Sequence, residues 1–392
     1  MSNFDLVIVG GGLASARAIR GYREAGGEGS IALISRDSSI PYHRPPLSKR
    51  FLRGEATPED TLVEPPDFYE DNGVELLLDT EVERVLPGES VVTVGGRALH
   101  YSKLLLATGA VPLRLKVEGA DLPGVFTLRT LDDSMAIREA AAETRDAVVV
   151  GSGFIGMEVA ASLTQLNCDV TLVTRDVDLF VQLGSPEISE HLVALYGERG
   201  IDIVRGVELS AFRGRSKLDS VEVHSREPIA AGLAVVGIGV KPAVDFLVGS
   251  GIVVDNGVVV NDRYETNVPN IYAAGDVANF HDPVFGRRRR IEHWSNANYQ
   301  GAEVGAVMAG TGRSYDAVST FFTESFGLKL KVFGDTSQHD DRVLEGSFAD
   351  GDAIVYYLAE GRLVGTLHTG QSEEAEDRLK ELIRSGATFA KA

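Results

Sequence analysis

The chain has 392 residues, of which 44% are hydrophobic and 24% charged, and its formal net charge is −19. This length favours two or three domains over a single core, and the acidic balance favours a soluble protein and argues against general nucleic-acid binding. The only cysteine, Cys168, excludes an internal disulfide, a dithiol redox centre and a four-thiolate cluster, and we expect no metal site.

Two segments of the chain repeat one plan of strand, glycine-rich turn, helix and strand. The first copy has a strand at 5–9, a helix at 13–25 and a strand at 30–35. The second has a strand at 147–150, a helix at 154–166 and a strand at 169–174. This order is typical of βαβ units in a parallel sheet. Because the first strand begins at once and no apolar run approaches the roughly 20 residues of a membrane span, we expect no leader, no membrane anchor and a cytoplasmic location.

The remaining elements complete the predicted organisation. Strands are expected within 104–112, 235–242 and 271–276, and from about residue 314 the pattern changes to hairpins with strands at 328–333, 353–358 and 363–368, followed by a helix at 372–385. The predicted fold is α/β, with two Rossmann-like domains and a C-terminal α+β domain. The predicted domains are a discontinuous first domain (1–112 and 243–313), a second domain inserted into it (113–242) and the C-terminal domain (314–392).

The first glycine turn reads Gly10-Gly-Gly12-Leu13-Ala14-Ser15. In a G-x-G-x-x-G/A turn, the first two glycines let the backbone approach a pyrophosphate, and the following helix N-terminus adds partial positive charge. The last position needs only a small side chain, so Ser15 is a mild departure. The turn predicts a dinucleotide site.

The second turn, Gly151-Ser-Gly153-Phe154-Ile155-Gly156, fits the pattern fully. Two such turns in one chain predict two bound dinucleotides.

The residues after each second strand bear on the two ribose contacts. A carboxylate there suits a free 2′-hydroxyl, whereas an arginine suits a 2′-phosphate. In the first βαβ unit Arg36 occupies the expected position, and Asp37 is the alternative ribose ligand. In the second βαβ unit Thr174 and Arg175 favour NADPH over NADH. The alternative is that Arg175 is solvated and Asp176 binds the ribose.

Together these motifs resemble the FAD-dependent pyridine nucleotide-disulfide oxidoreductases, in the branch of the ferredoxin and rubredoxin reductases and the apoptosis-inducing factor. The resemblance runs over nearly the whole chain. Its most specific piece is Pro41-Tyr-His-Arg-Pro-Pro-Leu-Ser-Lys49. Further matches are Ala107-Thr108-Gly109, Gly153-Phe-Ile-Gly-Met-Glu158, Gly237-Ile-Gly239 with Pro242, Tyr272-Ala-Ala-Gly275-Asp276, and Glu292-His293-Trp294 followed by Ala297 and Gln300-Gly301.

The resemblance implies that the first domain (1–112 and 243–313) is the FAD-binding domain and that the inserted one (113–242) is the NAD(P)H-binding domain. It also implies roles for single residues by position. Asp276 would bind the ribityl chain of FAD, and Trp294 would approach the flavin through its backbone. Arg44, Pro46 and Lys49 would line the isoalloxazine, and Glu158 would pair with Lys49 beside the nicotinamide. The bland alternative for Lys49 and Glu158 is ordinary surface charge. Catalytic roles are therefore predicted for Lys49 and Glu158, and the other predicted cofactor-binding residues are Gly10, Gly12, Leu13, Ala14, Ser15, Arg36, Asp37, Ala107, Thr108, Gly109, Gly151, Gly153, Phe154, Ile155, Gly156, Thr174, Arg175, Gly239, Gly275, His293, Ala297 and Phe322.

Two departures from the family narrow the chemistry. The relatives that use a dithiol, and those with one cysteine in the loop at Tyr42-His43-Arg44, have thiols that this chain lacks. Many of the reductases carry Trp-Ser-Asp early in the last domain, where this chain has Phe321-Phe-Thr-Glu-Ser-Phe326, and Phe322 is expected to replace the tryptophan at the flavin. The resemblance then implies that NADPH or NADH delivers hydride to FAD and that electrons leave directly from the flavin.

The expected acceptor is a small iron–sulfur carrier, most readily a [2Fe–2S] ferredoxin that serves a P450 or an oxygenase, with rubredoxin as the alternative. A plain NAD(P)H oxidase, and a redox-sensing interaction protein, stay open as other readings. The run Arg287–Arg290 either docks an acidic ferredoxin or forms an exposed loop paired with nearby acids. The sequence leaves the oligomeric state open between monomer and homodimer.

Overall fold

The computed structural model describes residues 2–388, so residue 1 and residues 389–392, at the ends of the first and last predicted domains, lie outside the described residues. The chain divides into two compact units. One contains the residues up to 43 together with 59–111 and 241–319, and the other contains 44–58, 112–240 and the residues from 320 onward. The three-domain division remains a prediction beside this two-unit description.

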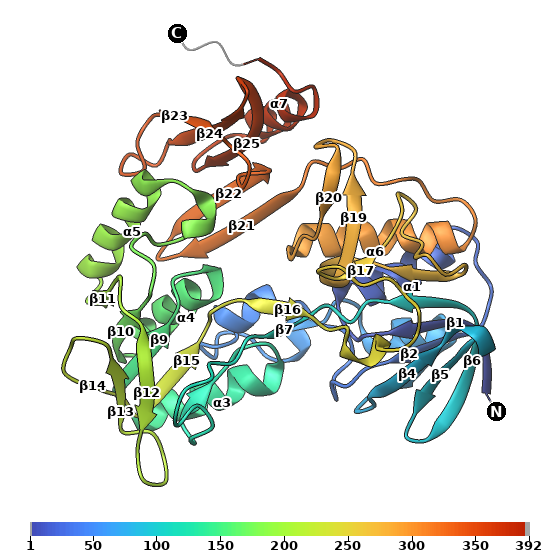
Figure 1. Ribbon diagram of the computed structural model, residues 1–392, viewed down its shortest axis with the longest axis horizontal. Coiled ribbons are helices and arrows are strands. Elements are labelled where there is room, and N and C mark those ends of the chain that lie inside the picture. Colours follow the sequence, from blue (N-terminus) through green and yellow to red (C-terminus); the bar gives the residue numbers. More distant parts are fainter. Residues whose placement is uncertain (1, 389–392) are drawn as a thin grey trace. The chain divides into compact units, whose positions relative to one another are not determined.

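The first unit is built on a seven-stranded sheet (Figure 1). Strands β3, β2, β1, β6 and β18 are parallel, and β4 and β5 extend the sheet in antiparallel fashion. The bounds are β1 Ser2–Val9, β2 Ile31–Ile34, β3 Val74–Leu77, β4 Val82–Leu86, β5 Val91–Val94, β6 Arg97–Leu106 and β18 Ile271–Ala273. The apolar runs of β1, β2, β6 and β18 are buried, as expected for a sheet covered on both faces, whereas those of the edge strand β3 are partly buried.

Two helices of the first unit approach each other closely because glycine lies at their contact. They are α1 (Leu13–Glu24) and α6 (Trp294–Met308). A Cβ atom at Gly305 would lie 2.2 Å from the backbone oxygen of Ala18. The unit also contains α2 (Pro66–Asp71) and a small sheet of β17 (Val258–Val259), β19 (Ala278–Asp282) and β20 (Arg287–Arg289).

The second unit contains a five-stranded parallel sheet with strand order β11-β10-β9-β15-β8. Its strands are β8 Val125–Phe126, β9 Asp146–Val150, β10 Asp169–Val173, β11 Asp202–Val204 and β15 Leu233–Val236. Its helices are α3 Leu131–Glu143, α4 Phe154–Gln165 and α5 Pro186–Glu198. A three-stranded antiparallel sheet follows, made of β12 Leu209–Arg213, β13 Ser220–Val223 and β14 Ile229–Ala230. The short strands β7 (Ala110–Pro112) and β16 (Val240–Pro242), which contain the boundaries between the two units, pair with each other.

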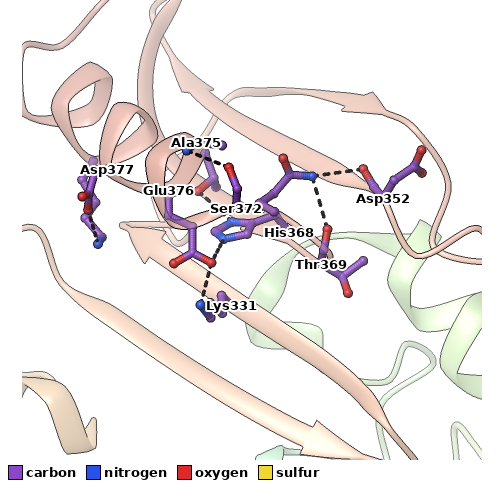
Figure 2. Close-up of polar contacts among 11 residues, drawn as sticks. Lys331, Asp352, His368, Thr369, Ser372, Ala375, Glu376 and Asp377 are labelled. Atoms are coloured by element: carbon purple, nitrogen blue, oxygen red, sulfur yellow. Dashed lines mark hydrogen bonds and ion pairs between the residues drawn. The ribbon is translucent and has the colours of Figure 1, made fainter.

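The C-terminal part of the second unit is a five-stranded antiparallel sheet with one helix. The strand order is β21-β22-β25-β24-β23, and the bounds are β21 Thr320–Ser325, β22 Leu328–Gly334, β23 Asp341–Glu345, β24 Ile354–Ala359, β25 Arg362–His368 and α7 Glu373–Arg384. Figure 2 shows how α7 is attached: Glu376 Oε1 accepts a hydrogen bond from Lys331 Nζ at 2.6 Å and lies 3.7 Å from Nε2 of His368. Burial of the His368 ring lowers its pKa to about 4.

The predicted α/β class, with two Rossmann-like halves and a C-terminal α+β part, is confirmed. Both predicted βαβ units form, with strand and helix ends within a few residues of the expected ones. Within residues 2–388, no helix is both long and apolar enough to cross a membrane.

Candidate functional site

The first glycine turn closes tightly against the end of strand β6. Gly10 has φ +117°, and a Cβ atom there would lie 2.2 Å from the backbone oxygen of Ala107. Gly12 is the N-cap of α1, and no side chain caps that helix. Ser15 is fully buried, and its hydroxyl donates a hydrogen bond to the Gly10 carbonyl. Serine at the last motif position therefore ties the turn closed, and the first NH groups of α1 remain available to an anionic group.

The small residues predicted around the flavin cofactor converge in the first unit. A Cβ atom at Gly275 would lie 3.1 Å from Cβ of Ala14 and 3.7 Å from Cβ of Ala297. Gly275 opens the short 3₁₀ helix η6 (Gly275–Val277), and its NH donates to Gln300 Oε1 at 2.9 Å. The strand β18 and the helix α6 thus bring Asp276 to the same end of the sheet as the first glycine turn.

Several buried polar atoms at this end of the first unit have no partner among the described residues. Gln300 Nε2 and Asn296 Oδ1 are two of them, and both side chains lie on α6. Buried polar groups are normally paired, so atoms of this kind are suited to bonds with a polar ligand. The cradle of small residues, the uncapped helix and these atoms fit a bound dinucleotide such as FAD.

His293 and Trp294 mark the start of α6. His293 is the N-cap, and burial lowers its pKa to about 4, against the opposing effect of Asp276. Trp294 is 38% exposed, and its indole Nε1 donates to Nδ1 of His43 at 2.9 Å. This bond joins the start of α6 to a histidine of the first unit. Sequence reasoning did not foresee this contact, which joins residues 251 positions apart.

The two alternatives for the adenosine ribose contact are placed as follows. The Arg36 side chain is 69% exposed and lies 3.8 Å from Glu81. Asp37 Oδ2 accepts a hydrogen bond from the Tyr42 hydroxyl at 2.5 Å, and Oδ1 accepts one from the NH of Ser39. Asp37 therefore shapes its own loop, and both roles at the ribose remain predictions.

The segment after β6 turns away from the sheet through the predicted Ala107-Thr108-Gly109 motif. Thr108 Oγ1 donates to the Ala243 carbonyl at 2.7 Å, and Gly109 has φ +68°. The threonine therefore joins two parts of the first unit that are 135 residues apart in the chain.

The second glycine turn repeats this geometry in the second unit. Gly151 has φ +107°, and a Cβ atom there would lie 2.4 Å from the Gly237 carbonyl oxygen. A Cβ atom at Gly156 would lie 1.9 Å from the Gly151 carbonyl oxygen, so α4 can begin this close to β9 only with glycine. Gly153 caps α4 without help from any side chain. This turn too fits a dinucleotide phosphate.

Of the predicted cofactor-binding side chains near the second turn, one is packed against aromatic rings and another is exposed. Phe154 packs against Phe180 and Phe321, with ring centroids 4.9 and 4.7 Å away. Ile155 is 42% exposed. Gly239 has φ +109°, and the nearest atom to a Cβ built there is Leu113 Cδ1 at 3.7 Å. Phe154 therefore has a structural explanation, whereas the exposed Ile155 is available to a ligand.

The predicted specificity residues follow strand β10. Thr174 is buried, and its Oγ1 lies 3.0 Å from Ser152 Oγ and accepts from the NH of Asp176. The Arg175 side chain is 79% exposed and lies 3.8 Å from the Asp176 carboxylate. Thr174 thus shapes the turn, and Arg175 presents its guanidinium to solvent.

The predicted ion pair forms within the second unit. Lys49 Nζ lies 2.6 Å from Glu158 Oε2, and the Glu158 side chain is only 5% exposed. Lys49 follows the 3₁₀ helix η1 (Pro45–Ser48), whose N-cap is Arg44 and which contains Pro46. Glu158 lies in the second turn of α4. Glu158 is buried and the Lys49 side chain is 19% exposed, so the pair is better shielded from solvent than an ordinary surface charge pair.

Two hydroxyl groups that the sequence did not single out complete this cluster. Ser48 Oγ donates to Glu158 Oε2 at 2.5 Å, and Thr323 Oγ1 donates to Glu158 Oε1 at 2.7 Å. Phe322 precedes Thr323 in β21 and is 50% exposed. Because successive residues of a strand alternate between faces, Phe322 lies on the face opposite Thr323.

The remaining predicted features are Cys168 and the arginine run. Cys168 is buried, and burial raises the pKa of its thiol. Arg288 donates to the Val260 and Asn279 carbonyls, Arg289 pairs with the buried Asp282 at 2.8 Å, and Arg290 bonds the Asp276 carbonyl and Glu292. Within the described residues, no group of three or more potential ligands could hold a metal ion.

Sequence comparison, structure comparison and a family model all relate this chain to flavoprotein reductases of one family. The chain is 34% identical over 370 residues to putidaredoxin reductase of Pseudomonas putida, covering 93% of this chain and 88% of the relative. It is 36% identical over 369 residues to the ferredoxin reductase subunit of a 5,5′-dehydrodivanillate O-demethylase of a Sphingobium species, covering 93% and 89%. The structure matches that of the reductase in a covalent putidaredoxin reductase–putidaredoxin complex with a TM-score of 0.93 and 33% identity, covering 98% and 94% of the two chains. Residues 4–301 match the model of the pyridine nucleotide-disulphide oxidoreductases, and the chain belongs to that family.

Proposed function

We propose that this protein is an NAD(P)H-dependent flavoprotein reductase that passes electrons from NAD(P)H through FAD to a small iron–sulfur protein, a [2Fe–2S] ferredoxin of a P450 or oxygenase system. The observation that carries the proposal is the buried Lys49–Glu158 pair in a chain with two dinucleotide turns and no redox-active thiol. Bound FAD would accept hydride from the nicotinamide and release electrons one at a time.

Lys49 and Glu158 are suited to a role at the flavin. An ammonium group close to a flavin favours its anionic reduced form, and a buried carboxylate partner keeps the ammonium in place. The 2.6 Å separation and the 5% exposure of Glu158 support such a fixed charge. Arg44 and Pro46, next to the same short helix, would line the ring, as the resemblance implies.

The thiol chemistry of other family members does not fit this chain. Cys168 is the only cysteine, and its sulfur lies 3.9 Å from the Ala141 and Thr144 carbonyl oxygens in a buried setting. Nucleophilic thiols need a lowered pKa and access, whereas burial raises the pKa of this one. Electrons must therefore leave the flavin for an acceptor without a protein disulfide.

The relatives support an iron–sulfur acceptor. Those named above are reductases of putidaredoxin and of a ferredoxin, and a rubredoxin–NAD(+) reductase of Pseudomonas putida is 32% identical over 363 residues. We favour a [2Fe–2S] ferredoxin over rubredoxin because the identity to the putidaredoxin and ferredoxin reductases is 34% and 36%, against 32% to the rubredoxin reductase, at nearly equal coverage.

The arginine run has a structural explanation of its own. Arg288, Arg289 and Arg290 all use guanidinium hydrogens within the first unit. This favours the alternative in which the arginines pair with nearby acids over the one in which they dock an acidic ferredoxin, although the run forms strand β20 and not the expected loop.

The nucleotide preference, the location and the assembly are further parts of the proposal. The exposed guanidinium of Arg175, with no carboxylate at position 174, favours NADPH over NADH. A single buried cysteine suits the reducing cytoplasm. We propose that the chain acts there as a monomer or homodimer.

Stopped-flow absorbance tests the acceptor. The FAD-loaded protein is reduced anaerobically with NADPH or NADH and mixed with a [2Fe–2S] ferredoxin, with rubredoxin, or with oxygenated buffer. We expect the ferredoxin to restore the flavin absorbance fastest. Faster reoxidation by rubredoxin would make the chain a rubredoxin reductase, and faster reoxidation by oxygen would make it an oxidase. A reduced flavin that persists with all three would favour a redox sensor.

A further inference from the structure

The carboxylate of Glu158 is held from three positions of the chain. Its Oε2 atom accepts from Ser48 Oγ at 2.5 Å and faces Lys49 Nζ at 2.6 Å, while its Oε1 atom accepts from Thr323 Oγ1 at 2.7 Å. Ser48 and Lys49 are neighbours in the chain, so one oxygen faces a single local segment. The other oxygen is bonded by a residue 165 positions away.

Thr323 is placed rigidly enough to orient this carboxylate. It is 4% exposed and lies in β21, paired with Leu330 of β22. Two residues earlier in the strand, Phe321 packs edge-to-face on Phe154 of α4 with ring centroids 4.7 Å apart. The strand is therefore fixed both to its neighbouring strand and to the helix that contains Glu158. A threonine in a strand also has few χ1 rotamers, which keeps the direction of its hydroxyl defined.

The hydroxyl has an energetic as well as a geometric effect. A buried carboxylate needs several donors, and hydrogen bonds to charged groups are stronger than neutral ones. Without Thr323, Oε1 would lie in a buried setting without this donor, and the carboxylate could rotate about its terminal bond. Because Oε2 also serves Lys49, such rotation would loosen the ammonium.

We infer that Thr323 is a positioning residue that fixes the Glu158 carboxylate, and through it the Lys49 ammonium, for hydride transfer. This inference rests on the proposed function. It assigns to the first strand of the C-terminal sheet a part in the chemistry of the Lys49–Glu158 pair, in addition to any contact with an electron acceptor.

The test compares variants of the FAD-loaded protein, with Glu158 intact and in a Glu158→Gln background. Thr323→Val removes the hydroxyl at nearly constant volume, and Thr323→Ser keeps it. Ser325→Ala is the matched control, because Ser325 lies two residues along the same face of β21 and is 9% exposed. Thr323→Ala replaces the valine variant if that protein does not fold. Each is measured for flavin midpoint potential with a chemical reductant and for the rate and concentration dependence of flavin reduction by NADPH and NADH.

We expect Thr323→Val to slow reduction at saturating nucleotide about tenfold, the loss of one hydrogen bond to a charged group, with little change in nucleotide affinity. Its midpoint potential should fall, because the ammonium is less fixed, while Thr323→Ser and Ser325→Ala behave as the unaltered protein. In a Glu158→Gln background, Thr323→Val should add no further effect.

Three results would overturn the inference: an unchanged rate and potential in Thr323→Val, an equal loss in Thr323→Ser, or an undiminished effect in the Glu158→Gln background. The potential does not depend on nucleotide. If the unaltered protein is not reduced by either nucleotide, the proposed function fails, whereas a normal unaltered protein with a normal Thr323→Val variant removes only this inference.

Discussion

At the scale of single residues, His368 is a buried imidazole that the proposed chemistry does not use. It is 1% exposed, its ring stacks edge-to-face with Phe333 at 4.6 Å, and Glu376 lies 3.7 Å from Nε2. Desolvation outweighs the attraction of Glu376 and lowers the pKa from 6.5 to about 4. The folded protein therefore keeps this histidine neutral over a pH range in which the unfolded chain protonates it.

The sign of the resulting pH dependence follows from linkage. Between pH 6.5 and about 4 the unfolded state binds the extra proton, so the free energy of unfolding falls as the pH falls. In the unaltered protein the part of this decrease in the free energy of unfolding that is due to His368 is on the order of 3 kcal/mol at most, and His368→Gln should abolish that part. Urea unfolding at a series of pH values, with the exposed His224→Gln as the control, measures it. His293 contributes in the same direction and remains in both variants. Equal acid sensitivity in His368→Gln and the control would contradict this account.

Arg175 gives a second prediction at this scale. Its exposed guanidinium is the group available to a 2′-phosphate, so Arg175→Ala should weaken NADPH binding about tenfold and leave NADH binding nearly unchanged, as expected for one charge-assisted contact. Nucleotide titrations measure the ratio. Arg145→Ala is a matched control, since Arg145 is 72% exposed, pairs with Asp169 and precedes β9, at the opposite end of the strand from the glycine turn. An unchanged NADPH to NADH ratio would assign the ribose contact elsewhere.

The sequence predicted the Lys49–Glu158 pair only through the family resemblance, and it did not predict the two hydroxyl donors. Serine and threonine are common residues with no spacing signal, and Thr323 reaches Glu158 only because the C-terminal sheet packs on α4. The hydrogen bond from the Trp294 indole was not predicted either, because its partner His43 lies in a loop far away in the sequence. Contacts of this kind depend on tertiary packing, which a linear pattern does not contain.

At the scale of elements, the glycine turns are the most predictable part of the molecule. A strand, a tight turn and a helix are local in sequence. Gly10, Gly151 and Gly156 each lie where a Cβ atom would collide with a backbone oxygen. Antiparallel strands such as β12, β13 and β14 were not foreseen, because short strands of mixed burial carry weak periodicity.

Gly156 tests the element-scale account. Gly156→Ala places a Cβ atom 1.9 Å from the Gly151 carbonyl oxygen, so α4 must move away from β9. We expect loss of nicotinamide nucleotide binding and a destabilisation of about 2 kcal/mol or more, in the range of overpacking. The control is Gly197→Ala in α5, where a Cβ atom meets nothing within 4 Å. Because alanine has the higher helix propensity, this variant should raise the free energy of unfolding by about 0.5 kcal/mol or more. Urea unfolding and nucleotide titration measure both, and normal binding by Gly156→Ala would refute the steric argument.

At the scale of the whole molecule, two dinucleotide turns of one geometry occur in two compact units, and one cysteine lies buried away from both turns in sequence. The doubling of the turn was visible in the sequence. The grouping of residues 44–58 with the second unit was not, because this short segment joins that unit through tertiary contacts such as the hydrogen bond from Ser134 to the Leu47 carbonyl.

The central claim is that nicotinamide nucleotide reduces FAD bound to this chain, and anaerobic titration tests it most directly. The purified FAD-loaded protein is titrated with NADPH and separately with NADH while the long-wavelength flavin absorbance is followed. The account predicts that the absorbance is lost as nucleotide is added, with NADPH the more effective. An absorbance that neither nucleotide changes, in a protein shown to contain FAD, would contradict the claim.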